Sequence, residues 1–252
     1  MSLVAPVLAL QLTGSAVAAP ALHPELSGAV RAWVDEGQPA TLDEERLASV
    51  GLLIDWLAAQ QAKGEPAPLL FVCTHNSRRS QMGQAWARAA AMELGLDQVS
   101  TWSGGTEATA FNPRAVTALR SHGFVIDATG RVVAEDNVVY TLGYGPETHD
   151  EAFSKVYGDA FNPSTGFAAV MVCSSADSSC PMVQGADLRV ALPYLDPKQS
   201  DGTPEEAATY RAKSEEIGRE MAWLMQAVAR RVSAKAPSSE AGASGPTSSP
   251  KR

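Results

Sequence analysis

The sequence predicts an α/β protein with a central parallel sheet of about four strands and helices on both faces. Three short apolar segments stop abruptly at polar or reactive residues, at 68–72, 99–102 and 167–172. Apolar residues recur at helical spacing over 80–94, and again in a long final helix over 206–232. Alternating strands and helices whose strands are apolar throughout are typical of a parallel sheet covered on both sides.

The composition is that of an ordinary globular protein and excludes several classes. The chain has 252 residues, of which 45% are hydrophobic and 19% charged, and its formal net charge is -8. This length suits one domain with extensions or two small domains. We expect no membrane span, because no apolar run reaches about 18 residues. We expect no nucleic-acid partner either, because an acidic chain lacks the basic footprint that neutralises phosphates.

The N-terminal region divides into an apolar arm, residues 1–21, and a helical extension, residues 22–66. The arm has the apolar stretch and small residues of an export signal, but it lacks the positive segment that usually precedes them. We therefore expect a cytoplasmic protein, with export as the alternative. Helical spacing in the extension predicts helices over 23–37 and 41–64, the second opened by a capping box that starts at Thr41.

The main domain is expected over residues 67–232, followed by a disordered tail over 233–252. Within the domain, a further helix is predicted over 114–121 and a further strand over 188–192. Residues 130–160 show no clear period, which predicts a partly irregular insertion. The tail consists mainly of small residues and proline without apolar periodicity, so it cannot bury enough surface to offset its ordering entropy.

Four residues whose side chains could take part in a reaction follow predicted strands: Cys73, Ser103, Cys173 and Asp196. In open parallel sheets, functional sites form beyond the carboxyl ends of the strands. These residues are therefore expected to converge on one edge of the sheet. Unrelated core positions would not usually share that placement.

The segment after the first strand, residues 73–80, has the chemistry of an oxyanion-binding loop. Between a strand and a helix, its backbone N–H groups can point inward, and the helix N-terminus favours the thiolate of Cys73. Arg79 can donate two parallel hydrogen bonds to a tetrahedral anion, which Lys cannot match. Ser80 can hydrogen-bond the thiolate, and Asn76 can brace the loop. The predicted loop comprises Thr74, His75, Asn76, Ser77, Arg78, Arg79 and Ser80.

Several of these residues also have ordinary structural interpretations. Free cysteines are often buried small hydrophobes, and an odd number of them is not a disulfide framework. His75 can brace a loop, Arg78 can either capture anions or face solvent, and Asp196 before proline is a common turn residue. The four histidines are not clustered with the cysteines at zinc spacing, so we expect no metal site.

Taken together, these motifs resemble the low-molecular-weight tyrosine phosphatase superfamily. The resemblance rests on the loop 73–80, the segment 103–106 and the pair 196–197, and it covers about residues 69–232, with unmatched residues before 167. Residues 172–181, which contain Cys173 and Cys180, resemble the redox segment of the thioredoxin-coupled arsenate reductases.

The resemblance to these reductases implies a relay of three cysteines. Cys73 would attack arsenate, Cys173 would attack Cys73 as arsenite leaves, and Cys180 would resolve that disulfide. Reduced thioredoxin would then restore the thiols, without a tightly bound cofactor. In the phosphatase alternative, Cys73 and Arg79 act with Asp196 as general acid, Ser103 supports the loop, and the cysteine pair protects the nucleophile. A catalytically idle anion-binding module is a third interpretation, against which the intact set of residues counts.

The spacing of Cys173 and Cys180 has a structural consequence. Seven residues of straight helix rise about 10.5 Å, whereas disulfide-bonded Cα atoms lie about 4.4–6.8 Å apart. Residues 173–180 are therefore expected to form a loop, or to unwind on oxidation. The chain also departs from the family: His75 replaces the usual Gly, and Gln84 replaces a Glu associated with potassium, so we carry over no potassium site. Lys198 follows where the phosphatases have aromatic residues, which weakens the case for phosphotyrosine.

Overall fold

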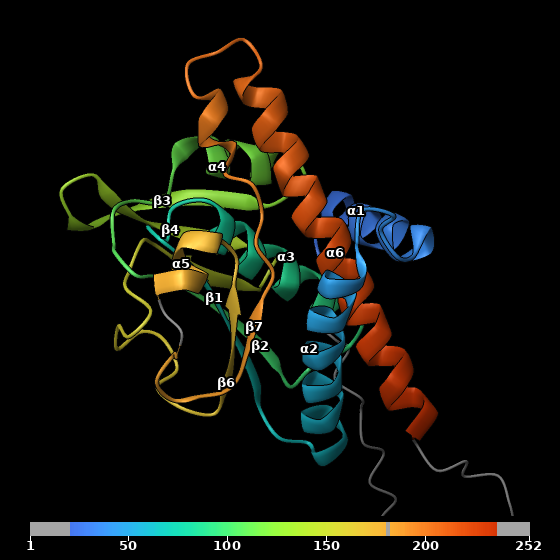
Figure 1. The fold of residues 1–252 in the computed structure, drawn as a ribbon. Helices are drawn as coiled ribbons and strands as arrows, with labels where there is room; N and C mark the ends of the chain where they lie inside the picture. Colours follow the sequence, from blue (N-terminus) through green and yellow to red (C-terminus); the bar gives the residue numbers. More distant parts are fainter. Residues whose placement is uncertain (1–20, 180–181, 236–252) are drawn as a thin grey trace, which may run out of the picture.

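The computed structural model describes residues 21–179 and 182–235, and in this part of the chain a four-stranded parallel sheet forms the centre (Figure 1). The strand order is β2-β1-β6-β7, and every neighbouring pair is parallel. The predicted fold class is confirmed. Residues 1–20, the arm for which export was the alternative, and Cys180 lie outside the described residues. The strands are β1 (Ala67–Cys73), β2 (Val99–Gly105), β6 (Phe167–Met171) and β7 (Ala186–Ala191).

Helices surround this sheet. Helix α3 packs against β1 and β2, α6 lies against α3, and α2 contacts both α6 and β7 (Figure 1). Among the described helices, none is long and apolar enough to cross a membrane. The helices are α1 (Pro24–Glu36), α2 (Glu44–Lys63), α3 (Arg79–Glu93), α4 (Pro113–Arg120), α5 (Ser174–Ser179) and α6 (Glu206–Lys235), with a short 3₁₀ helix, η1 (Pro197–Ser200).

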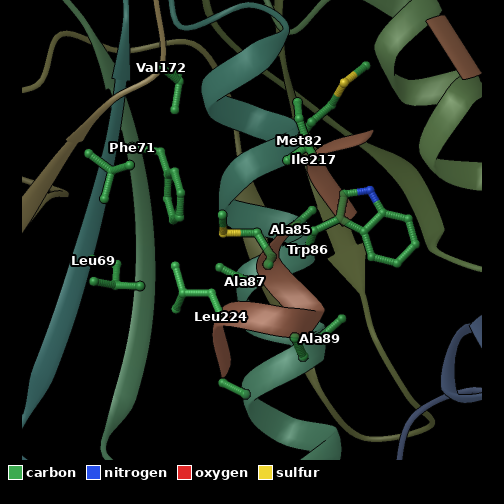
Figure 2. Close-up of a cluster of buried hydrophobic side chains, with 14 of the residues drawn as sticks. Leu69, Phe71, Met82, Ala85, Trp86, Ala87, Ala89, Val172, Ile217 and Leu224 are labelled. Carbon is green, nitrogen blue, oxygen red and sulfur yellow. The ribbon is translucent and has the colours of Figure 1, made fainter. Parts of the chain in front are cut away.

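The core lies between the sheet and α3, as Figure 2 shows. Leu69 and Phe71 of β1 are fully buried and point toward α3. Gly83 permits this close packing, because a Cβ at that position would lie 2.6 Å from the Phe71 ring. Trp86 lies on the side of α3 that faces away from the sheet, and it donates its indole N–H to Ser214 of α6 at 3.0 Å (Figure 2). Strand β1 and helix α3 are thus held rigidly on both sides of the loop that joins them.

The predicted N-terminal helices belong to the same core. Trp33 of α1 meets Trp86 edge to face, with ring centroids 4.7 Å apart. A Cβ at Gly218 of α6 would lie 2.3 Å from the Trp33 ring, so this glycine lets α1 and α6 approach closely. Removing the extension would therefore expose apolar surface of the main domain, which makes it a structural part of the molecule.

The second face of the sheet is covered by residues 153–166, which precede β6, and by α5. Thr101 donates its hydroxyl to the Gln84 carbonyl of α3, so the next residue of β2, Trp102, points to the opposite face. There it packs against Phe161, with ring centroids 5.9 Å apart. Helix α5 contacts β1 and β6. Both faces are therefore covered, as the apolar strands predict.

The insertion over residues 130–160 is partly irregular, as predicted, but it also contains strands that were not predicted. A three-stranded antiparallel sheet, in the order β3-β4-β5, runs through it. Register shifts after Ala128 and after Val132 break the two-residue alternation, and β3 is exposed along most of its length. Because the two-residue alternation is interrupted twice, the sequence shows no clear strand pattern there. The strands are β3 (Val125–Ala134), β4 (Asn137–Gly143) and β5 (His149–Ala152).

Two predicted boundaries also need correction. Helix α2 is capped by Asp43 and not by Thr41, since the Asp43 carboxylate accepts the Arg46 N–H at 2.8 Å. Helix α6 continues to Lys235, beyond the predicted start of the tail, and the rest of that tail lies outside the described residues. The segment after Cys173 begins as the short helix α5, so of the two alternatives for residues 173–180 the unwinding of a helix on oxidation stays a prediction.

Candidate active site

The carboxyl edge of the parallel sheet brings three loops together through backbone hydrogen bonds. The N–H of Val172, just before Cys173, donates to the Val72 carbonyl at 2.8 Å. The Tyr194 N–H donates to the Val172 carbonyl at 3.1 Å, and this links the Asp196 loop to the same edge. The loops that carry the predicted nucleophile, second thiol and acid are therefore neighbours.

Cys73 ends β1 and faces Ser80 at the start of α3. Its sulfur lies 3.1 Å from the Ser80 hydroxyl oxygen, and the residue is only 3% exposed. The same oxygen accepts the Asn76 side-chain N–H at 2.8 Å. Because this acceptor position is filled, the hydroxyl proton is free to point at the sulfur. Ser80 is thus oriented to donate a hydrogen bond to a thiolate.

Asn76 lies at a bend of the oxyanion loop and connects the loop to neighbouring segments through hydrogen bonds. Its φ of 46° lies in the left-handed region, which asparagine tolerates better than most residues. Its side-chain oxygen accepts the Lys155 N–H at 2.9 Å, and its carbonyl accepts the Gln81 side-chain N–H at 3.1 Å. The residue is fully buried. Lys155 and Gln81 carry no recognisable local motif, so sequence reasoning missed both as supports.

Gly105 lets the end of β2 approach the oxyanion loop closely. A Cβ there would lie 2.3 Å from the Glu107 carbonyl oxygen and 2.7 Å from both the Asn76 nitrogen and the Thr74 oxygen. All three obstacles are backbone atoms, which cannot turn aside. The Glu107 N–H also donates to the Thr74 carbonyl at 2.8 Å. The predicted support residue Ser103 lies within β2, and its buried hydroxyl has no hydrogen-bond partner among the described residues.

The outer side of the oxyanion loop is tied to neighbouring segments. The His75 carbonyl accepts the Ser154 hydroxyl at 2.8 Å, while its half-exposed imidazole lies 3.6 Å from Glu107. The Ser77 hydroxyl donates to the Ala110 carbonyl at 2.7 Å. The His75 imidazole and the Ser77 hydroxyl are therefore engaged with residues outside the oxyanion loop.

Arg79 reaches from the first turn of α3 to the Asp196 loop. Its Nη1 donates to the Tyr194 carbonyl at 2.9 Å, and its Nη2 donates to the Asp196 carboxylate at 2.6 Å. Its Nε is buried and has no hydrogen-bond partner in the described part of the chain. Asp196 also caps η1 by accepting the Lys198 N–H at 3.0 Å. The Asp196 carboxylate thus caps η1 and also pairs with Arg79, the candidate anion-binding residue.

Arg78 does not face solvent. Its Nε donates to the Tyr210 hydroxyl at 2.7 Å, and its side chain is only 12% exposed. The Tyr210 hydroxyl in turn donates to Asp201 at 2.7 Å, and burial together with this contact raises the pKa of Tyr210 to about 12. Asp201 lies 3.5 Å from the Arg78 guanidinium and offsets part of its charge.

A cavity of about 450 Å³ opens beside the oxyanion loop. His75 and Arg78 line it on the loop side, and Lys198 lines it from η1. The turn between β3 and β4 adds the exposed carboxylates of Glu135 and Asp136. The antiparallel insertion therefore contributes charged groups to the surroundings of the candidate site.

Cys173 is the second buried thiol at this edge. It is 1% exposed, and its sulfur lies 3.4 Å from the Thr74 hydroxyl oxygen of the oxyanion loop. The sulfur also accepts the Ala176 N–H from the first turn of α5 at 3.3 Å. Cys180 lies outside the described residues. The structure thus brings Cys173 against the residue that follows Cys73.

The chain is similar to known proteins of one family. The model of the low molecular weight phosphotyrosine protein phosphatase family matches residues 68–138. An arsenate reductase of Bacillus subtilis (strain 168) is 31% identical over 151 residues, which are 60% of this chain and 88% of the relative. One from Bacillus licheniformis is 28% identical with the same coverage.

Among solved structures, a low molecular weight protein tyrosine phosphatase from Bacillus subtilis has a TM-score of 0.42 and 18% identity, covering 67% of this chain and 98% of its own. The family model spans the segment that contains the oxyanion loop, and the match to the Bacillus subtilis reductase is about twice as long. The chain belongs to the family that comprises the low molecular weight phosphotyrosine phosphatases and these arsenate reductases, and it is an enzyme of this type.

Proposed function

We propose that this enzyme reduces arsenate to arsenite through Cys73, Cys173 and Cys180, with reduced thioredoxin as the electron donor. The observation that carries the proposal is the position of Cys173. Its sulfur lies 3.4 Å from the hydroxyl of Thr74, the residue next to Cys73. A phosphatase needs no second thiol there, whereas a reductase must draw two electrons from its own thiols. The similar curated relatives are arsenate reductases, which supports the same choice.

The reaction begins with attack of the Cys73 thiolate on arsenic. One arsenate oxygen leaves as water, and a Cys73–arsenic(V) bond forms. The Cys173 thiolate then attacks the Cys73 sulfur. The sulfur–arsenic bond breaks, and its electron pair stays on arsenic, which leaves as arsenite. The Cys180 thiolate next displaces Cys73 from the Cys73–Cys173 disulfide. The two thiols of thioredoxin finally reduce the Cys173–Cys180 disulfide, so the electrons balance.

The other site residues stabilise charge and move a proton. Backbone N–H groups of the oxyanion loop and the fork of Arg79 hold the arsenate oxygens. Ser80 stabilises the Cys73 thiolate when it attacks and when it leaves. An arriving anion competes with Asp196 for Arg79, because both are negative. Once released from Arg79, Asp196 takes up a proton from solvent and passes it to the departing oxygen.

A second candidate is phosphomonoester hydrolysis through a Cys73 phosphoenzyme. The family model that matches residues 68–138 favours it, because that family is the low molecular weight phosphotyrosine protein phosphatases. Cys73, Arg79 and Asp196 would serve as nucleophile, anion ligand and general acid. Cys173 and Cys180 would then protect Cys73 from irreversible oxidation by disulfide formation.

The deciding experiment follows NADPH consumption with arsenate, thioredoxin and thioredoxin reductase. We expect sustained turnover in the wild type, and in Cys180→Ser at most one turnover, with a Cys73–Cys173 disulfide that mass spectrometry detects. Ser175→Ala, an exposed substitution in α5, is the matched control and should retain turnover. The reductase proposal fails if arsenate supports no NADPH consumption while aryl phosphate hydrolysis persists in Cys180→Ser.

A further inference from the structure

Arg46 of α2, in the N-terminal extension, contacts the loop that carries Asp196. Arg46 forms a two-pronged ion pair with Glu220 of α6, with Nε to Oε1 at 2.9 Å and Nη2 to Oε2 at 2.7 Å. Its third nitrogen, Nη1, donates to the Pro193 carbonyl at 2.8 Å. The side chains of Arg46 and Glu220 are only 17% and 3% exposed. All the hydrogen-bonding nitrogens of this guanidinium are therefore used in one fixed geometry.

Tyr194 completes the arrangement. Its hydroxyl donates to Glu220 Oε2 at 2.8 Å, and the Arg46 guanidinium carbon lies 4.5 Å from the centre of its ring. Burial and the charge of Glu220 raise the pKa of Tyr194, so the hydroxyl remains a donor. Burial disfavours the charge of Arg46, but the hydrogen bond to Glu220 holds its pKa above the ordinary value. We call Arg46, Glu220 and Tyr194 the Arg46 clamp.

The clamp is joined to the candidate catalytic groups through the backbone of Tyr194. The Tyr194 carbonyl accepts Arg79 Nη1 at 2.9 Å, and its N–H donates to the Val172 carbonyl at 3.1 Å. Asp196 lies two residues further along and bonds the other prong of Arg79. A shift of Tyr194 would therefore move the partners of Arg79 as well as the backbone next to Cys173.

A buried ion pair is weak evidence for stability, because removing two charges from water costs several kcal/mol. Such pairs instead select one geometry, since the fork of Arg accepts few alternative arrangements. Two other pairs join the N-terminal helices to α6, Asp55 with Arg231 and Glu36 with Arg219. Their side chains are more exposed, and neither pair contacts the Asp196 loop in the described structure. The clamp differs from them in both respects.

We propose that the Arg46 clamp is a positioning device through which the N-terminal extension holds the Asp196 loop against Arg79. Asp196 then presents its carboxyl at the oxyanion loop in one orientation. The clamp touches no substrate and acts through Tyr194. The kinetic part of this proposal rests on the proposed role of Asp196 as general acid, whereas its structural part does not.

The test compares Arg46→Lys with Asp55→Asn in the full chain. Lysine keeps the charge of Arg46 but cannot bond Glu220 at two points and Pro193 at a third. Asp55→Asn breaks the pair with Arg231, which also joins α2 to α6. Hydrogen–deuterium exchange of the peptide covering residues 190–199 is the first readout. We expect about tenfold faster exchange of the Tyr194 amide in Arg46→Lys and wild-type exchange in Asp55→Asn.

The second readout is hydrolysis of p-nitrophenyl phosphate and phenyl phosphate. The phenyl ester has the poorer leaving group and depends more on a positioned acid, so Arg46→Lys should lower its kcat about tenfold more than that of the nitrophenyl ester. The inhibition constant of inorganic phosphate should stay within about threefold of wild type, because the oxyanion loop is intact. Tyr194→Phe, which loses one hydrogen bond of the clamp, should give a smaller change of the same kind.

Unchanged exchange of the Tyr194 amide in Arg46→Lys would overturn the proposal, whatever the kinetics. An equal kcat loss for both esters would also overturn it, because it would show general damage. Asp196→Asn run beside them separates the two ideas. If that variant slows neither ester, the acid role of Asp196 is wrong, and the exchange experiment still decides the clamp.

Discussion

The oxyanion loop and the Asp196 loop lie at the same edge of the sheet but are held by different parts of the chain. The oxyanion loop is braced from within the main domain, by Asn76, Gly105 and the backbone of Lys155. The Asp196 loop is braced by Arg46 of the N-terminal extension. The family model matches residues 68–138, which include the first loop but neither Arg46 nor Asp196. The proposed anion-binding loop thus lies within the segment that the family model matches, whereas the loop of the proposed acid is held by a residue of the N-terminal extension.

The largest effect is expected from Gly105→Ala, which attacks the oxyanion loop. The added Cβ would lie within 2.3–2.7 Å of three backbone atoms, so the loop must move. We expect phosphate binding and turnover to fall together, by about 100-fold or more, as for a misplaced reacting group. Phosphate titration calorimetry and steady-state kinetics measure the two effects. Gly158→Ala is the control, since a Cβ there meets nothing within 4 Å. Equal activity of both variants would contradict the tight-approach argument.

A smaller and more selective effect is expected from Asp196→Asn. The amide removes the transferable proton, while its oxygen can still accept the Lys198 N–H that caps η1. Turnover should fall by about 10²-fold, the lower range for loss of a general acid, while phosphate binding is retained. Single-turnover kinetics and phosphate calorimetry separate the two quantities. An unchanged rate would show that Asp196 takes no part in the mechanism. A loss of both turnover and phosphate binding would contradict the idea that the two loops have separate roles.

The smallest effect on activity is expected from Lys155→Met. The Lys155 ammonium group lies 4.6 Å and 5.2 Å from the ring centres of Phe153 and Phe161, and the residue is 3% exposed. Burial lowers its pKa from 10.5 to about 8. Its support of Asn76 comes from the backbone N–H, which the substitution keeps. Turnover should therefore change little, while stability changes with pH.

The sign of the pH dependence follows from proton binding. Between about pH 8 and 10.5 the unfolded chain keeps the Lys155 proton and the folded chain has lost it, so folding stability rises with pH in that window. At pH 7 the buried charge costs stability in full, and Lys155→Met should raise the unfolding free energy by about 3 kcal/mol, because each pKa unit between 10.5 and 8 corresponds to about 1.4 kcal/mol. Urea unfolding at pH 7, 9 and 10.5 should show this advantage shrinking with pH. Lys63→Met, at an exposed site, should show no such trend, and a constant advantage for Lys155→Met would refute the argument.

Much of the fold could be predicted because its signals are local. The apolar strands stop where Cys73 and Cys173 begin the polar loops, and helical spacing marks α3 and α6. The antiparallel insertion escaped prediction because register shifts at Ala128 and Val132 break its alternation. Its contribution of Glu135 to the cavity beside the oxyanion loop was missed for the same reason.

The sequence by itself determined the strand, the Cys73 to Ser80 loop and the helix that follows, because a ring of N–H groups at a helix N-terminus needs only neighbouring residues. Only the tertiary structure decided what holds each loop. Arg46 and Glu220 are 174 residues apart, and their charges pair only once the fold brings both beside Tyr194. Lys155 likewise reaches Asn76 only when the insertion folds against the sheet. Contacts of this kind depend on how distant surfaces pack, which no local pattern records.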